Sequence, residues 1–184
     1  MKKVVAFMGS PRKNGNTATL VAEVVKGAEA AGAQVKVFPI NEMNIRPCQS
    51  CFSCRKQYGC PIDDDMKSVY EEIKQADAVV IGSPVYMLQV AGQVKVLFDR
   101  LFPLMDANFS PRCGIKKTVM IYSQGQTGAD SFKASFDLNA SVLQVMGLEV
   151  AETIVCTGAN RPDTAAGDAK LLQRAYAAGR KLAE

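Results

Sequence analysis

Apolar residues occur along the chain in two patterns, short near-continuous runs and longer stretches with a helical period. The near-continuous runs at 4–8, 34–40, 78–81, 117–122 and 148–156 predict strands. The periodic stretches that follow them, at 17–32, 63–73, 92–102, 131–146 and 164–183, predict amphipathic helices. Strand and helix therefore alternate five times, which is typical of a parallel sheet covered by helices on both faces.

This pattern predicts an α/β fold in which residues 1–184 form one domain around a doubly wound, five-stranded parallel sheet of order 2-1-3-4-5. In such sheets, ligands bind beyond the carboxyl ends of the strands, where the strand order reverses. The informative residues should then lie in the loops after strands one, three and four. Segment 41–62 fits neither period and is interpreted as a cysteine-rich loop.

The sequence GSPRKNGNT at 9–17 joins the first strand to the first helix. Free N–H groups at a helix N-terminus favour an anion, and the glycines at 9 and 15 let the backbone approach it closely. Neither the Walker A spacing nor the G-x-G-x-x-G fingerprint is present. The segment predicts a phosphate-binding loop or, alternatively, a plain strand–helix turn capped by Thr17. The candidate ligand-binding residues are Ser10, Arg12, Asn14, Asn16 and Thr17.

Composition narrows the class of protein. The chain has 184 residues, 48% hydrophobic and 22% charged, which fits one globular domain. The net charge of +4 is mild and its Lys and Arg residues are scattered, so no nucleic-acid surface is expected. No apolar stretch reaches membrane-spanning length and no signal peptide is recognisable, so we expect a cytoplasmic protein away from the membrane.

The chain contains no histidine, which excludes Ser–His and Cys–His nucleophiles and imidazole metal ligands. It has six cysteines, which in a reducing compartment suggest metal binding or redox chemistry. Cys113 and Cys156 are interpreted as packing residues, and the acidic run 63–65 as a solvated helix N-terminus rather than a metal site. The other four are spaced C-x2-C-x2-C-x5-C and are candidate metal ligands: Cys48, Cys51, Cys54 and Cys60.

The GSPRKNGNT loop, the GSPVY segment at 82–86 and the KVLFDR segment at 95–100 together resemble the flavodoxin-like NAD(P)H-dependent FMN reductases. The resemblance implies that the first loop holds the FMN phosphate. It implies that the second loop packs beside the flavin ring through Pro84, Val85, Tyr86 and Met87. The loop after strand four would border the ring with Ser123, Gln124 and Gly125.

The cysteine spacing resembles that of the iron–sulfur flavoproteins, a branch of the same family that carries a [4Fe–4S] cluster. Four thiolates can complete such a cluster. Zinc held by four thiolates, and free or disulfide-forming thiols, stay open as alternatives.

The resemblance implies an FMN-dependent oxidoreductase that takes electrons from NAD(P)H or a redox protein partner and passes them to an acceptor. The alternative is a non-enzymatic electron carrier of the flavodoxin type, which Arg12 and the positive net charge disfavour. The flavin carries the chemistry, so no catalytic side chain is expected. Surplus large apolar residues between 94 and 105 predict a homo-oligomer, a dimer or tetramer, and the resemblance implies association through this region.

Overall fold

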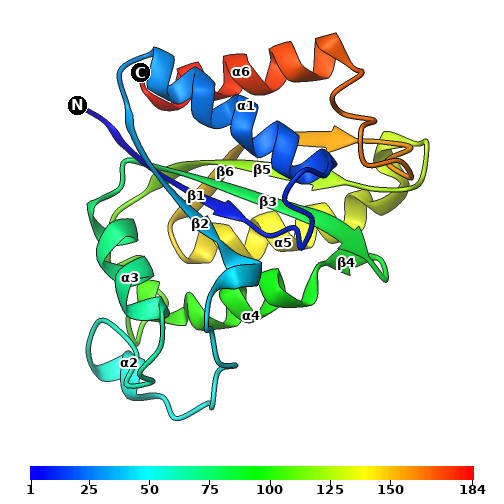
Figure 1. The fold of residues 1–184 in the computed structure, drawn as a ribbon. Coiled ribbons are helices and arrows are strands. Elements are labelled where there is room, and N and C mark those ends of the chain that lie inside the picture. The colour runs from blue at the N-terminus through cyan, green and yellow to red at the C-terminus, as the bar shows by residue number, and fades with distance from the viewer.

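A computed structural model describes all residues from 1 to 184. Five parallel strands form the sheet: β1 (Lys3–Met8), β2 (Gln34–Pro39), β3 (Ala78–Tyr86), β5 (Lys116–Ser123) and β6 (Leu148–Cys156). Their order is β2-β1-β3-β5-β6, and a short strand, β4 (Gln89–Val90), pairs antiparallel with β3 (Figure 1). With β4 set aside, this is the predicted 2-1-3-4-5 order, so the fold prediction is confirmed.

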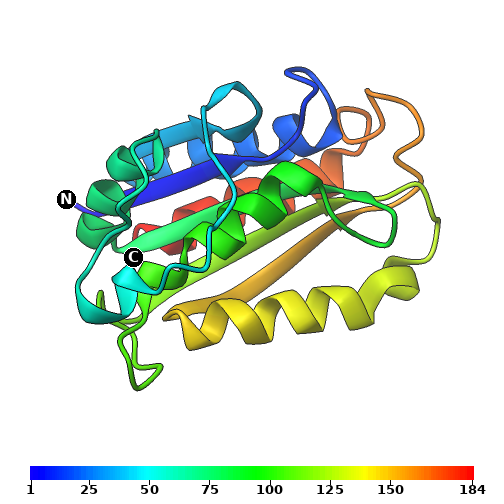
Figure 2. The same cartoon turned by 90° about the horizontal axis from the view of Figure 1, so that it is seen from below.

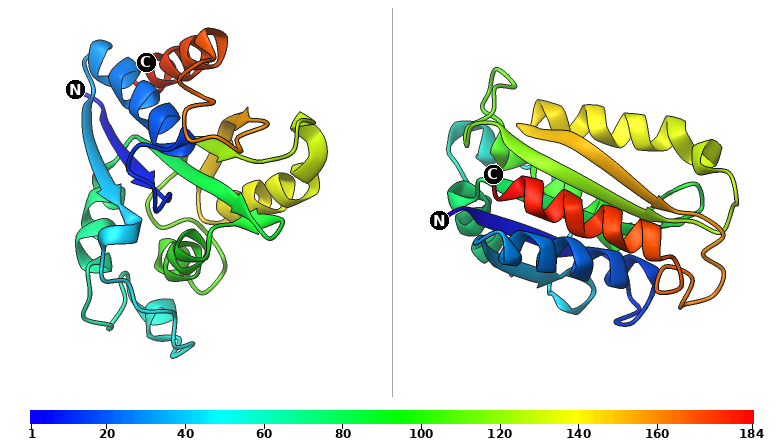
Figure 3. Two further views of the ribbon diagram at one scale, coloured as in Figure 1. Left: turned by 45° about the vertical axis from the view of Figure 1, so that its right-hand side comes forward. Right: turned by 90° about the horizontal axis from the view of Figure 1, so that it is seen from above.

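Helices cover both faces of the sheet. The helices α1 (Asn16–Ala30) and α6 (Ala169–Leu182) lie side by side on one face (Figure 3). The other face carries α3 (Met66–Gln75), α4 (Gly92–Arg100) and α5 (Lys133–Val145) (Figure 2). The remaining elements are α2 (Ser53–Lys56) and three short 3-10 helices, η1 (Ile40–Glu42), η2 (Phe102–Leu104) and η3 (Ala129–Phe132).

Strand β1 shows why a strand covered on both faces appears as an unbroken apolar run. Val4 and Ala6 point into the core beneath α1 and α6, whereas Val5 and Phe7 point into the core on the opposite face. Successive side chains of a strand point to opposite faces, so every position is buried when both faces are covered.

Strand β3 continues to Tyr86, beyond the Ile81 end that the sequence predicted. Its pairing with β1 stops at Gly82, whereas its pairing with β5 continues to Pro84. At Ser83 and Pro84 the strand therefore pairs with β5 alone, before β4 joins it at Val85, and a proline is tolerated at such a partly open position.

A two-residue turn joins β3 to β4. Both of its residues, Met87 (φ 47°) and Leu88 (φ 69°), have left-handed backbone angles, and their side chains are 94% and 66% exposed. Turns of this type favour Asn-Gly. Because Met-Leu carries no turn signal, the sequence prediction missed both the hairpin and β4.

The last helix begins at Ala169, not near Thr164 as predicted. Asp168 caps it, with a carboxylate oxygen that accepts a hydrogen bond from the Leu171 N–H at 3.0 Å. Asp and Ser-type residues favour this capping position, which fixes the start of the helix. None of the helices is both long and apolar enough to cross a bilayer.

Candidate functional site

Loops from four strands meet at one end of the sheet, as seen at the right of Figure 2. They follow β1, β3, β5 and β6 and enclose a polar cleft of about 350 Å³, called here the carboxyl-end cleft. This volume lies in the range of small-molecule sites. Its walls consist of Ser10, Arg12, Gly15, Asn16, Thr17, Pro84, Val85, Tyr86, Ser123, Gln124, Gly125, Ala159 and Asn160.

The cleft contains every predicted ligand-binding residue except Asn14 and Met87. Asn14 is exposed on the first loop, and Met87 lies at the hairpin tip. The sequence analysis missed Ala159 and Asn160, which follow β6. The signal was available, because the loop after the fifth parallel strand must reach the same sheet edge.

The first turn of α1 faces the cleft with unpaired donors. The N–H groups of Asn16, Thr17 and Ala18 have no backbone acceptor, and no side chain caps the helix. The exposed Arg12 makes none of the ion pairs of the chain, so its guanidinium is free. Free helix N–H groups beside a free guanidinium form an anion site.

Asn16 is 6% exposed, and its side-chain amide forms hydrogen bonds with the loop after β6. Its Nδ2 donates to the carbonyl of Arg161 at 2.6 Å and to that of Ala159 at 3.4 Å, and its Oδ1 accepts from the Ala165 N–H at 2.8 Å. The sequence analysis treated this side chain as a phosphate donor. The structure instead uses it to hold the fourth wall of the cleft.

Two further contacts join the cleft walls. The hydroxyls of Thr17 and Ser123 lie 2.7 Å apart and link the α1 end to the β5 end. The Asn160 side chain donates to the Gly125 carbonyl at 3.2 Å. These contacts form within the protein alone, so the cleft is preorganised for a ligand.

Gly9 allows the first loop to pack directly on β3. Its N–H donates to the Gly82 carbonyl at 2.8 Å. A Cβ at position 9 would lie 2.5 Å from that carbonyl oxygen and 2.1 Å from Cγ2 of Val94. No residue but glycine fits between these backbones without displacing one of them.

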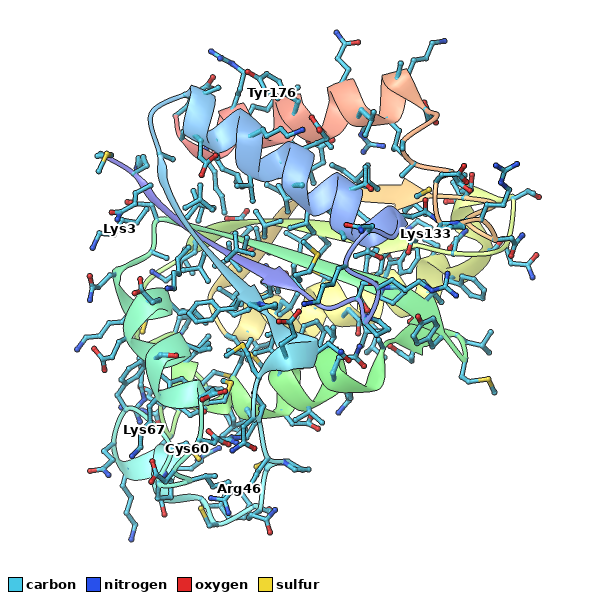
Figure 4. All side chains as sticks on the ribbon, in the orientation of Figure 1. Lys3, Arg46, Cys60, Lys67, Lys133 and Tyr176 are labelled. Carbon is cyan, nitrogen blue, oxygen red and sulfur yellow. The ribbon has the colours of Figure 1, made fainter.

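The cysteine segment, defined as residues 47–63, lies away from the carboxyl-end cleft. It leaves the end of β2 and passes below the sheet, so that α2 comes to lie next to α3 (Figure 1). Figure 4 shows Cys60 and Arg46 on this lower side of the molecule. The segment folds back beneath α4 (Figure 1), and none of its thiols lines the carboxyl-end cleft of the same chain.

The structure gathers no group of three or more possible metal ligands. Cys48 and Cys51 are exposed, whereas Cys54 and Cys60 are half-buried. Residues on both sides of Cys51, Ser50 (φ 52°) and Phe52 (φ 57°), have left-handed backbone angles. The donor set suits an iron–sulfur cluster chemically, but this conformation does not assemble it.

The neighbouring thiols differ in acidity. Hydrogen bonds from the backbone and hydroxyl of Ser53 lower the pKa of Cys51 below its ordinary value. Burial, together with the charge of Cys60, raises the pKa of Cys54. Cys51 is therefore the thiol of this pair that ionises first as the pH rises.

A second, apolar cavity of about 640 Å³ lies between α4 and α5. Cys48, Phe52 and Cys54 line it, and so do Gln89 and Val90 of β4. Beside it, α5 exposes an apolar stripe of Leu138, Val142 and Val145, which are 58%, 40% and 46% exposed.

This stripe corrects the sequence argument about surplus apolar residues on α4. Val94, Leu97, Phe98 and Leu101 are all buried within the chain, and the 3-10 turn η2 buries Leu104 as well. Exposed large apolar residues lie instead on α5 and on the β3–β4 hairpin, and singly elsewhere, as at Phe52, Phe109 and Ile115.

This sheet order, with a polar cleft at the carboxyl ends of the strands, defines a flavodoxin-like nucleotide-binding fold. The profile of a family described as NADPH-dependent FMN reductase matches residues 2–159. The chain belongs to that family, and the family predicted from its sequence is confirmed.

Curated relatives support the predicted branch. An iron–sulfur flavoprotein of Methanocaldococcus jannaschii is 37% identical over 102 residues, which are 55% of this chain and 53% of that protein. One from Archaeoglobus fulgidus is 29% identical over 167 residues, 91% of this chain and 82% of that protein. The chain spans about half the length of most of the curated relatives it matches.

Solved structures confirm the fold. An NAD(P)H:quinone oxidoreductase from Methanothermobacter marburgensis superposes with a TM-score of 0.76 at 19% identity, covering 98% of both chains. An azoreductase from Bacillus anthracis has a TM-score of 0.69 at 17% identity, covering 100% of this chain and 99% of that one. At these identities the likeness concerns the fold alone.

Proposed function

We propose that this chain is a single FMN-binding unit and acts as an FMN-dependent oxidoreductase that accepts electrons from NAD(P)H. The observation that carries the proposal is the carboxyl-end cleft, in which unpaired N–H groups of α1 and the free Arg12 face the walls supplied by β3 and β5. Family membership and the curated relatives support the flavin as the ligand. The proposed setting is cytoplasmic.

Each wall of the cleft has a role in this proposal. The Arg12 guanidinium and the first-turn N–H groups of α1 bind the phosphate of FMN. Val85 and the half-exposed Tyr86 supply an apolar face against which the flavin ring rests. The bound flavin supplies the electron-transfer chemistry, and the protein orients it and keeps one side accessible to the electron donor.

Anaerobic absorbance spectroscopy tests this function. Stoichiometric NADH or NADPH should reduce the bound flavin, which is seen as a loss of its visible absorbance. A flavodoxin-type carrier would keep its flavin oxidised under the same conditions, and that result would contradict the proposed activity. The comparison of the two nucleotides also identifies the preferred donor.

We further propose that Cys48, Cys51, Cys54 and Cys60 together hold a [4Fe–4S] cluster. The spacing of the four thiols and the names of the curated relatives support this assignment. A bound cluster would supply one-electron transfer to or from a redox protein partner. The exposed, left-handed backbone around Cys51 would have to rearrange to bring the thiols together.

Iron and acid-labile sulfide assays on anaerobically reconstituted protein test the cluster. We expect about four irons per chain, and Cys51→Ser should lose them while FMN stays bound. Cys113→Ser is the matched control, because Cys113 is a half-buried thiol outside the motif and should keep the iron. Stoichiometric flavin with no iron would leave zinc or free thiols as the alternatives, which a zinc assay separates.

We propose that the α5 stripe is the contact surface of a homo-oligomer, with a second copy of this chain as its occupant. Its three exposed side chains adjoin the apolar cavity between α4 and α5, and this continuous apolar surface is typical of an interface. Light scattering should report at least a dimer, and Leu138→Glu should give a monomer. Ile115→Glu is the control, because Ile115 is 64% exposed at a separate place and should leave the mass unchanged.

A further inference from the structure

The chain enters the cysteine segment through residues 44–46 and leaves it through residues 64–65. These two stretches are hydrogen-bonded to each other and are called here the neck. The Asn44 and Arg46 N–H groups donate to the carboxylates of Asp65 and Asp64, at 2.7 and 3.0 Å. The Asp65 N–H returns a bond to the Asn44 carbonyl at 3.1 Å. These bonds bring together two stretches that flank residues 47–63.

Arg100, on α4, closes this neck from the inside. Its guanidinium donates to both carboxylate oxygens of Asp64, at 2.6 and 3.0 Å, and to the Arg46 carbonyl at 2.6 Å. A single side chain therefore bridges the entering and the leaving stretch. The side chains of Arg100 and Asp64 are 1% and 0% exposed.

The sequence interpretation of the acidic run is thereby corrected at its middle residue. Asp63 is solvated, as expected, and its exposed carboxylate pairs with Lys67 at 2.7 Å. The Asp64 side chain is fully buried, and its carboxylate accepts hydrogen bonds from the Arg100 guanidinium and from the N–H groups of Arg46 and Met66. Because three identical residues follow one another, the sequence alone does not indicate which of the three aspartates is buried.

A buried ion pair of this kind needs an explanation other than stability. Removing both charges from water is costly, and well-packed apolar residues often stabilise a site equally well. The Nε of Arg100 is buried without any hydrogen-bond partner, which adds to the cost. What the pair provides that an apolar contact could not is a directional link between two backbone stretches and α4.

The rest of the segment has little regular secondary structure and is held by side-chain contacts. The four residues of α2 form its one helix, and it contributes no strand to the sheet. Arg112 donates to the carbonyls of Cys54 and Arg55, at 3.3 and 3.1 Å, and Tyr58 donates to the Tyr70 carbonyl at 2.6 Å. Arg55 also donates to the Ala107 carbonyl and lies over the rings of Phe102 and Phe109. These contacts hold the middle of the segment, whereas the neck holds its two ends.

We propose that Arg100 is a positioning residue for the cysteine segment, which it holds closed at the neck and anchored to α4. The proposal goes beyond the cluster assignment and does not depend on it, since every contact involved joins protein atoms. The four thiols are then carried on a loop whose ends are fixed, while the tip around Cys51 is free to rearrange.

Hydrogen–deuterium exchange on the flavin-bound full chain tests the proposal. In Arg100→Met, amides of residues 44–63 should exchange about 10- to 100-fold faster, as expected when charge-assisted hydrogen bonds are lost. Amides of β1 and β5 should keep their rates. Arg174→Met is the matched control, because Arg174 also bonds a carboxylate (Glu152, 2.8 Å) and a carbonyl (Thr153, 2.8 Å), but at the surface.

Two more variants keep the test decisive. Arg100→Lys keeps the positive charge but lacks the forked guanidinium that bonds both stretches. Amides of β1 and β5 should therefore keep their exchange rates, while amides of residues 44–63 should still exchange faster than in the wild type. Asp64→Asn keeps the shape of the neck, so it should open the same residues to a smaller extent even if Arg100→Met fails to fold. Unchanged exchange of 44–63 in Asp64→Asn and in a folded Arg100 variant would overturn the proposal.

Discussion

Replacing Asn16 separates two roles that the sequence alone cannot distinguish. If its amide holds the loop after β6, as its contacts with Arg161 and Ala165 indicate, Asn16→Ala should destabilise the protein before any ligand is added. If the amide instead bound phosphate, the same change would weaken FMN binding and leave the stability of the flavin-free protein unaltered.

The magnitude follows from the bonds that would be lost. Two well-formed hydrogen bonds contribute about 1–3 kcal/mol together, and the buried Ala165 N–H left unpaired raises the expected loss to about 2–4 kcal/mol. The 3.4 Å contact with Ala159 is long and adds little. FMN affinity should fall as well, because Ala159 and Asn160 form one wall of the cleft.

Urea unfolding of the flavin-free protein measures the first effect, and fluorescence titration with FMN measures the second. Asn14→Ala is the control, because this exposed neighbour makes none of the hydrogen bonds of the loop and should leave the unfolding midpoint unchanged. An Asn16→Ala protein as stable as the parent but poor in FMN binding would refute our reasoning.

Four further predictions follow from single contacts. Arg12→Ala should weaken FMN binding by about 1.5–3 kcal/mol, the range of a charge-assisted bond, while riboflavin affinity measured in the same titration stays constant. Leu88→Gly should stabilise the protein by about 0.5–1 kcal/mol, since relief of left-handed strain outweighs the added chain entropy; a lower urea midpoint would contradict this. Gly9→Ala should destabilise by about 1–3 kcal/mol through overpacking against the Gly82 backbone, as read from thermal unfolding. Burial raises the pKa of Asp64, but the hydrogen bonds from Arg100, Arg46 and Met66 and the charge of Arg100 together hold it below its ordinary value. The stability that this carboxylate contributes is therefore present above about pH 4 and is lost as the pH falls further, so the difference in unfolding free energy between wild type and Asp64→Asn should be constant from pH 7 to 5 and narrow below about pH 4.

The sheet was predictable because its signal is local. The inner strands β1, β3 and β5 are buried on both faces, so a run such as Val4 to Met8 carries the information within itself. The convergence of the cleft loops was predictable from the topology, since parallel strands place their following loops at one edge. Strand β4 was not, because Met87 and Leu88 adopt a turn that their own preferences disfavour.

The roles of single polar side chains were less accessible. Asn16 finds its partners about 145 positions away, and Arg100 finds Asp64 36 positions away. No spacing pattern encodes such pairs. The second of them joins both ends of the cysteine segment to α4, so the sequence could predict four thiols as candidate ligands without showing where the segment lies.

The long-range contacts around the cleft also have a consequence for folding kinetics. Thr17 and Ser123 are 106 positions apart, and Asn16 and Ala165 are 149 apart. Closing such long loops is entropically costly and is rewarded only once both ends are in place, so these contacts should form after the transition state for folding. A ligand that depends on them binds the native state and not the transition state. Bound flavin should therefore slow unfolding in proportion to its affinity, while the refolding rate of the chain stays that of the flavin-free protein.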